Sequence, residues 1–253
     1  MARKRRSRVP VPGSVERALD AALDKALAIQ RPVVLAYLDR VRAKHPTASP
    51  ADVIDQLERR YLAAVIGTGA ASGGAAAMPG VGTGASIATG AAEIAAFVGA
   101  TAMFVLAVAE VHGVPITDPQ VRRALVLTVL LGDVAESAVE AAAAGGPHWA
   151  HVLGRANRDA IGGVNARLAH LMVGRFGARQ SALLLGRAIP FGIGAGIGAA
   201  GNAALARGAI NTARRAFGPA PRRFSSRVID GSQKTSRVRE LYRRTKGARR
   251  GRK

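Results

Sequence analysis

Residues 61–110 read YLAAVIGTGAASGGAAAMPGVGTGASIATGAAEIAAFVGATAMFVLAVAE, and they decide the fold. Their only charged residues are Glu93 and Glu110, and alanine and glycine dominate the rest. Pro79 and the glycine-rich run after it disfavour one continuous helix. The stretch therefore predicts a buried helical hairpin whose second arm spans residues 86–111.

Capping signals place helices on both sides of this hairpin. Ser49 at the N-cap, Pro50 at the first helical position and Asp52 in the first turn begin a helix that leads into the first arm. Asp118 and Pro119 give the same signature for the helix that follows the second arm.

Further helical patterns flank this centre. Leucines recur every four residues after Ser14, and Pro32 kinks or restarts that helix. An amphipathic pattern at 164–172 leads into a second uncharged segment, residues 188–206. No alternating strand pattern bounded by turn residues occurs. The sequence predicts an all-α fold, a compact helical domain with glycine-rich helical hairpins over residues 14–218.

The positive charge is concentrated at the two ends of the chain. The formal charge of +21 includes +5 from the tail 1–13 up to Arg8, and 13 basic against two acidic residues in the tail 219–253. We predict that both basic tails are flexible and attract polyanions. The candidate residues for binding an anionic surface are Arg3, Lys4, Arg5, Arg6, Arg237, Arg239, Arg243 and Arg244.

Two kinds of polyanion fit such tails. Aromatic residues make up 4% of the chain and Trp149 is its sole tryptophan, so stacking platforms for nucleic acid are scarce. Residues 236–245 place apolar side chains on one face among arginines, which suits a membrane surface. An anionic membrane is therefore the expected partner and nucleic acid the alternative, while a protein partner or a homo-oligomer stays open.

Two features that the sequence lacks, cysteine and a signal peptide, indicate the cellular compartment. The chain has no cysteine, which fits a reducing compartment and excludes a disulfide framework or a thiol nucleophile. The basic residues up to Arg8 are not followed by the apolar segment of a signal peptide. We expect a cytoplasmic protein at the inner face of the cell membrane.

Glycines four residues apart let helices approach closely, a device that membrane helices use. The best conventional spanning segment is 94–111, but glycine and proline break the uncharged runs, so spanning, a re-entrant hairpin and a soluble core all stay open. The helix-packing candidates are the pairs Gly69/Gly73, Gly80/Gly84, Gly192/Gly196 and Gly194/Gly198.

Three other patterns give no site. Residues 196–201 match the dinucleotide fingerprint, yet no strand precedes them and no acid follows at the ribose distance, so no cofactor is predicted. His148 and His151 have no third ligand at a diagnostic spacing, so no metal is predicted. A stripe of carboxylates on one helical face is interpreted as solvated: Asp133, Glu136 and Glu140.

Glu93 is the candidate catalytic residue. An acid within an apolar run must meet a cation, accept hydrogen bonds or take up a proton. Pairing with an arginine is the commoner arrangement, and proton chemistry is the alternative. In the second uncharged segment, Asn202 is predicted to join helices through its amide.

The glycine-rich blocks resemble EcsC-type bacterial proteins. YLAAVIGTG at 61–69, MPGVGTG at 78–84, Glu93 and the turn VHGVPITDP at 111–119 are similar to the family's first conserved block. IPFGIGAGIGAAGN at 189–202 is similar to its late segment. The resemblance covers residues 50–217 and implies a bacterial helical protein, named from an operon with an ABC exporter, whose biochemical activity is not settled.

These observations favour a non-enzymatic, membrane-associated protein, either peripheral or embedded. One alternative is a hydrolase or peptidase-like enzyme, which requires Glu93, His148, His151 or the pair Asp133 and Glu136 to converge in a pocket. The other alternative is nucleic-acid binding through the basic tails, with an affinity that falls steeply with salt.

Overall fold

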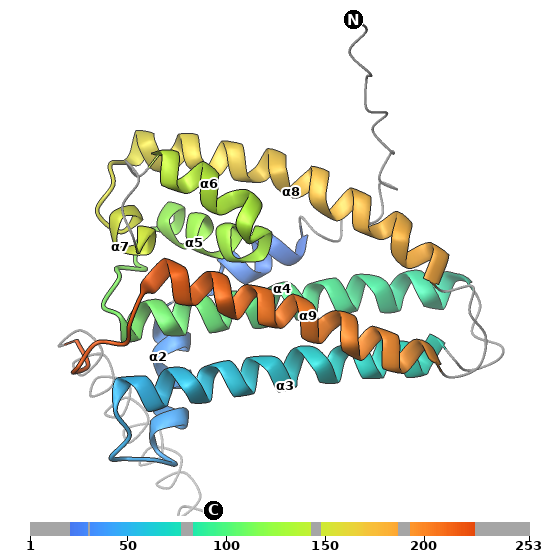
Figure 1. Ribbon diagram of the computed structural model, residues 1–253, viewed down its shortest axis with the longest axis horizontal. Helices are drawn as coiled ribbons and strands as arrows, with labels where there is room; N and C mark the ends of the chain where they lie inside the picture. Colours follow the sequence, from blue (N-terminus) through green and yellow to red (C-terminus); the bar gives the residue numbers. More distant parts are fainter. Residues whose placement is uncertain (1–20, 30, 77–82, 143–147, 187–192, 226–253) are drawn as a thin grey trace, which may run out of the picture.

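The computed structural model describes residues 21–29, 31–76, 83–142, 148–186 and 193–225. This part of the chain is helical and contains no strand, so the all-α prediction is confirmed (Figure 1). A helical segment at 21–27 precedes the elements α2 (Arg31–Arg42), α3 (Pro50–Ala76), α4 (Thr83–Val111), α5 (Pro119–Leu131), α6 (Asp133–Ala142), α7 (Trp149–Leu153), α8 (Arg158–Gly186) and α9 (Ile193–Phe217).

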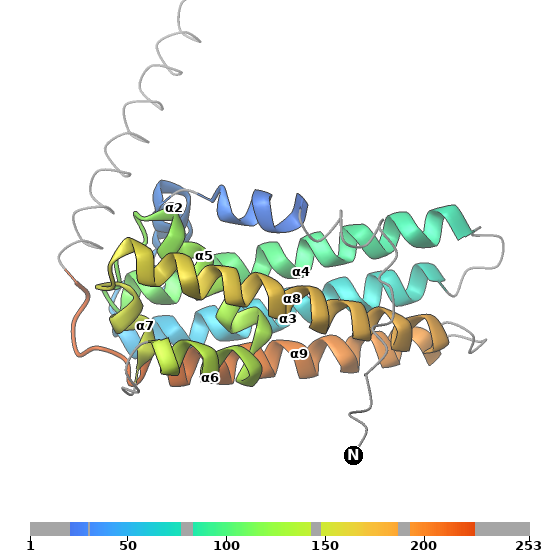
Figure 2. The ribbon, with the colours of Figure 1, turned by 90° about the horizontal axis from the view of Figure 1, so that it is seen from above.

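The long helices lie side by side (Figures 1 and 2). Helix α3 packs against both α4 and α9, while α5 lies between α4 and α8. The C-terminal ends of α3 and α8 and the N-terminal ends of α4 and α9 lie at the same end of the bundle. The break that we predicted at Pro79 falls outside the described residues.

Local capping chemistry fixes the helix ends as predicted. Asp52 Oδ2 accepts hydrogen bonds from the backbone N–H and the hydroxyl of Ser49, at 2.9 and 2.7 Å. Asp118 Oδ1 accepts from the N–H of Gln120 at 2.7 Å, directly before α5. Gly132, with φ of 61°, ends α5 so that α6 begins as a separate helix.

A polar contact pins α3 to α4 inside the apolar core. The hydroxyls of Tyr61 and Thr101 lie 2.8 Å apart, and Thr101 donates to the carbonyl of Phe97 at 2.8 Å. A hydroxyl carries one proton, so Tyr61 donates to Thr101. The Tyr61 ring stacks on Phe104 at 4.7 Å, and burial raises the pKa of Tyr61 to about 12. The phenol therefore stays neutral.

Helix α4 contains the described segment that is long and apolar enough to cross a membrane. This segment, Ala92–Val111, has a mean hydropathy of 2.2, and 67% of the apolar window is buried within the protein. A buried core helix of a soluble protein has the same character, so the segment alone does not show that the protein spans a bilayer.

Several helical glycines face open space, which gives a stability prediction. A Cβ added at Gly163 or Gly208 would have no neighbour within 4 Å. Alanine should therefore raise the free energy of unfolding by about 0.5–1 kcal/mol at each position. It lowers the conformational entropy of the unfolded chain and causes no clash in the folded protein. Chemical denaturation measures this, and a loss of stability would contradict the open surroundings.

Candidate functional site

A buried ion pair lies where α4 ends. Arg31, at the start of α2, donates from Nε to Glu110 Oε1 and from Nη2 to Oε2, the second bond at 2.9 Å. The Glu110 side chain is only 4% exposed, whereas that of Arg31 is 27% exposed. The bidentate contact compensates the carboxylate charge that the core would otherwise hold unpaired.

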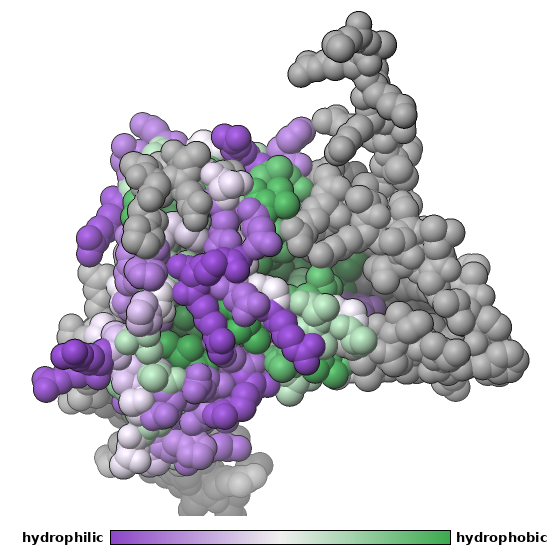
Figure 3. Space-filling model, viewed as in Figure 1, coloured by the Kyte–Doolittle hydropathy of each residue, from purple (hydrophilic) through white to green (hydrophobic). Residues whose placement is uncertain are grey.

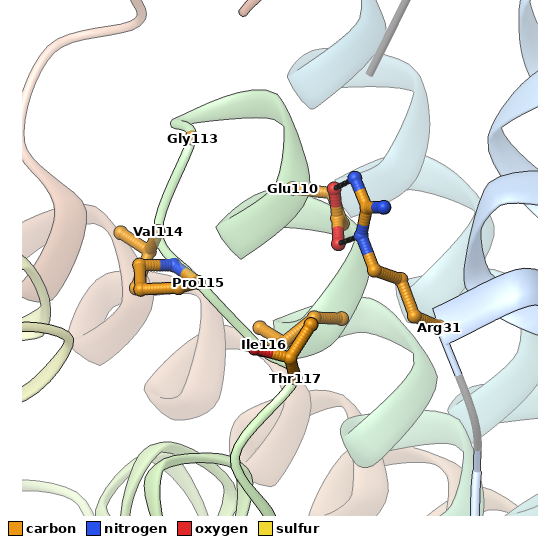
Figure 4. A pocket seen from close by; sticks show the side chains of 7 residues that line it. All are labelled: Arg31, Glu110, Gly113, Val114, Pro115, Ile116 and Thr117. Atoms are coloured by element: carbon orange, nitrogen blue, oxygen red, sulfur yellow. Dashed lines mark hydrogen bonds and ion pairs between the residues drawn. The ribbon is translucent and has the colours of Figure 1, made fainter. Parts of the chain in front are cut away.

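A pocket of about 430 Å³ opens beside this pair (Figure 4). Its other wall is the loop Gly113–Thr117, in which Val114 and Ile116 are buried. Arg122 holds this loop in place by donating to the carbonyl of Ile116 at 3.1 Å. Among the seven lining residues Glu110 is the one acid, and Arg31 occupies both of its oxygens. The pocket thus presents a neutralised pair and apolar walls rather than a poised general base.

A cluster of three histidines lies at the end of α4 and at α7. The ring of His112 stacks on Phe217 at 5.3 Å and meets the ring of His151 edge-on at 6.0 Å. His148 precedes α7, and its Nδ1 lies 3.4 Å from the carbonyl oxygen of Arg215. No group of three or more His, Cys, Asp or Glu side chains in the described part of the chain has the geometry to hold a metal.

The environment of His112 and His151 disfavours the charged forms of these two rings. Burial, with a smaller effect of His151 and His148, lowers the pKa of His112 to about 4. Burial also lowers the pKa of His151, against the opposing effect of its hydrogen bond to the Phe217 backbone. His112 is therefore neutral at physiological pH.

The carboxylate stripe of α6 is not solvated at Glu136. Arg215 of α9 donates from Nε to both Glu136 oxygens, at 3.0 and 2.9 Å, and from Nη2 to Asp133 at 2.6 Å. Glu136 is 8% exposed. The solvated interpretation is therefore wrong for Glu136, because tertiary packing brings a guanidinium onto it. Asp133 keeps an exposed side chain, and Glu140 lies on the same helix.

Glu93 meets an amide. The Nδ2 group of Asn202 donates to Glu93 Oε1 at 3.1 Å and to the carbonyl of Val65 at 3.2 Å. Glu93 is half-buried, and its hydrogen-bond partner among the described residues is Asn202 instead of the arginine that we expected. Asn202 lies on α9, Val65 on α3 and Glu93 on α4, so one side chain joins three helices.

Removal of this amide should destabilise the bundle. Asn202→Ala removes the donor to the half-buried Glu93 carboxylate and one of the donors to the Val65 carbonyl, which keeps the Thr68 hydroxyl at 2.9 Å. We expect the free energy of unfolding to fall by about 1–3 kcal/mol. The matched control is Asn211→Ala, at an exposed position of the same helix, with a change within about 0.5 kcal/mol. Equal effects of the two substitutions in urea denaturation would show that the amide contact contributes nothing.

The remaining candidate residues fall in two groups. Gly69 and Gly73 lie in α3, Gly84 at the start of α4, and Gly194, Gly196 and Gly198 in the first turns of α9, so they belong to helices that pack together. The others lie outside the described residues, namely Gly80, Gly192, Arg3, Lys4, Arg5, Arg6, Arg237, Arg239, Arg243 and Arg244.

The residues that a hydrolase would need do not meet. Glu93 precedes Val111 by 18 positions of one helix, about 27 Å along its axis at 1.5 Å per residue. The histidines lie beyond that end, and Asp133 and Glu136 share one guanidinium, that of Arg215. Glu93 therefore lies too far from the histidines to act with them.

Sequence reasoning missed Arg31, Glu110 and His112. Glu110 carried the same signal as Glu93, since both are acids in one apolar stretch. Applied to Glu110, that signal would have predicted a buried cation partner, although it could not have identified Arg31. His112 shows no local pattern, because its neighbours come from α7 and α9.

Comparison with protein-family models, with curated proteins and with solved structures found no match to this chain. The resemblance to EcsC-type proteins therefore stays a prediction.

Proposed function

We propose that this EcsC-like protein is a membrane-surface interaction protein that places one end of its helical bundle in a single leaflet of an anionic membrane. The observation that carries the proposal is the distribution of charge along the bundle. The inserting part, which we term the uncharged end, comprises residues 61–76 of α3, 83–92 of α4 and 193–206 of α9, and none of them is charged.

The opposite end holds the charged contacts. There Arg31 pairs with Glu110, Arg214 with Glu58, and Arg215 with Asp133 and Glu136. Figure 3 shows hydrophilic residues gathered over the end of the molecule where α7 lies, and hydrophobic residues toward the middle. A bundle of this kind has one end suited to water and one end at which α3, α4 and α9 carry no charge to desolvate.

The length of the uncharged end supports insertion into one leaflet. The segment 83–92 of α4 is about 15 Å long at 1.5 Å per residue, and the segment 193–201 of α9, which ends before Asn202, is about 14 Å long. The hydrocarbon core of a bilayer is about 30 Å thick, so these lengths match one half of it. Glu93 and its Asn202 partner mark the depth at which charge begins.

Basic residues suit the lipid headgroups at this boundary. Helix α8 ends beside the uncharged end and carries Arg175 and Arg179 in its C-terminal half. The two basic tails add further positive charge, and the anionic cytoplasmic leaflet is the surface that attracts them. We therefore propose the inner face of the cell membrane as the site of action.

Membrane fractionation tests the proposal. Membranes from producing cells are washed with high salt and then with alkaline carbonate, and we expect the protein to resist the salt wash. Full release into the soluble fraction by salt alone would contradict insertion and show that only the charges of the tails attach the protein to the membrane. Complete recovery in the first soluble fraction would contradict any membrane role.

A pair of charge substitutions tests which end inserts. Ala200 and Asn211 are both exposed on α9, the first within the uncharged end and the second beyond it. Ala200→Glu should weaken flotation with anionic vesicles by roughly a hundredfold, because a charge in the hydrocarbon costs about 2.5–3.5 kcal/mol. Asn211→Glu should have little effect. Equal binding by the two variants, with unchanged circular dichroism, would exclude insertion of this end.

A further inference from the structure

The chain turns sharply where it leaves α9. Phe217 is the last helical residue and is 2% exposed. Gly218 follows with φ of 75°, and its N–H donates to the carbonyl of Arg214 at 2.9 Å. Farther on, the Phe224 ring lies under the Arg42 guanidinium at 4.4 Å. The segment 217–225 therefore crosses from the end of α9 toward α2.

Three histidines hold the start of this segment. His112 stacks on the Phe217 ring, and the His151 ring meets the His112 ring edge-on. His148 covers Gly218 so closely that a Cβ there would lie 2.4 Å from the imidazole ring. His148 itself adopts the left-handed conformation, with φ of 64° and ψ of 51°. A non-glycine residue in this conformation costs free energy that its packing must offset.

The groups that face these rings do not favour added positive charge. The histidines face one another, and the Arg155 guanidinium acts on His151 from the loop after α7. On α9, the Arg215 carbonyl faces His148, while the Arg215 side chain is engaged with Asp133 and Glu136 of α6. Protonation of both His112 and His151 would therefore place like charges side by side near Arg155.

We propose that His112, His148 and His151 form a pH-sensitive latch, which holds Phe217 and Gly218 closed at neutral pH and releases the segment 217–225 as His112 and His151 become protonated. This proposal does not depend on membrane binding, since the latch lies within the folded chain. The released segment leads directly into the basic residues 226–253. Acidification would thus release the segment that precedes the C-terminal tail, while the rest of the bundle stays folded.

The effect of pH on the ratio of open to closed molecules has a defined sign and size. The pKa of His112 is lowered to about 4 in the closed state, against 6.5 for a solvated imidazole. Above pH 6.5 the ring is neutral in both states, so pH has no effect. As the pH falls below 6.5 the open state binds the proton first, and His112 alone raises the ratio of open to closed molecules by about 30-fold at pH 5.0.

Hydrogen exchange measured by mass spectrometry on the full chain without lipid tests this latch. The readout is the protection factor of residues 214–218, corrected for the intrinsic pH dependence of exchange. We expect it to fall by about 30-fold between pH 7.5 and 5.0. Protection of residues 57–65, in the middle of α3, should stay constant and so report that the bundle remains folded.

Variants identify the groups responsible. His112→Phe keeps a ring against Phe217 but cannot take a proton, so its protection factor should change less than threefold over the same pH range. His112→Gln serves the same purpose if the larger ring disturbs folding. His170→Gln, at an exposed position of α8, is the control and should behave as the wild type.

Three results would overturn the proposal. They are a constant protection factor in the wild type, an equal loss of protection in residues 57–65, and a wild-type response in both His112 variants. Because no membrane is present, each result leaves the proposed membrane role to its own test. A fall confined to residues 214–218 that needs His112 supports the latch.

Discussion

Replacing Arg31 by alanine is expected to lower the free energy of unfolding by about 3 kcal/mol, the low end of the range for breaking a buried ion pair. Glu110 is only 3% exposed. Without Arg31 its carboxylate would lose both charged hydrogen bonds where water cannot replace them. Denaturation in urea at pH 7 measures the change.

Two matched variants show whether the buried charge is the cause. Arg158→Ala removes an exposed arginine that lies 3.9 Å from Asp118, and we expect a change below about 1 kcal/mol. Combining Arg31→Met with Glu110→Met removes both charges, and this variant should recover most of the lost stability. If Arg31→Ala proves as mild as Arg158→Ala, the pair contributes little to the fold.

Replacing Gly218 by alanine is expected to cost about 2–4 kcal/mol. The backbone there has φ of 75°, which a side chain disfavours, and the new Cβ would lie 2.4 Å from the His148 ring. The ring is packed between the Arg215 carbonyl and Gly218, so the clash requires α7 or the end of α9 to move.

The matched control for this substitution is Gly208→Ala on the same helix. A Cβ at Gly208 meets nothing within 4 Å, so the same chemical change should stabilise the protein instead. Opposite signs for the two variants would establish that the conformation and the histidine contact make the glycine necessary. A loss below about 1 kcal/mol for Gly218→Ala would show that α7 adapts easily.

Features encoded within a few residues were predictable from the sequence. The starts of α3 and α5 follow from Ser49 and Asp118, whose side chains cap the N–H groups two or three positions later. The end of α5 follows from Gly132, because its positive φ is a local property of glycine. The all-α class needed only such local signals and the absence of strand patterns.

Features that depend on tertiary contact were not predictable. Arg31 and Glu110 are 79 residues apart, and Arg215 and Asp133 are 82 apart, so no spacing rule joins them. The solvated interpretation of the α6 stripe was wrong at Glu136 for this reason. Glu93 was correctly recognised as an acid that needs a partner, but the sequence could not decide between an arginine and the amide of Asn202.

The single amide that joins α3, α4 and α9 has a mechanical consequence. Asn202 donates to the Val65 carbonyl and the Glu93 carboxylate with the same nitrogen, so it fixes the axial register of all three helices at one level. Sliding α9 along its neighbours breaks both Asn202 hydrogen bonds at once, so the two contacts resist it together. Beyond this level no charged side chain belongs to the three helices.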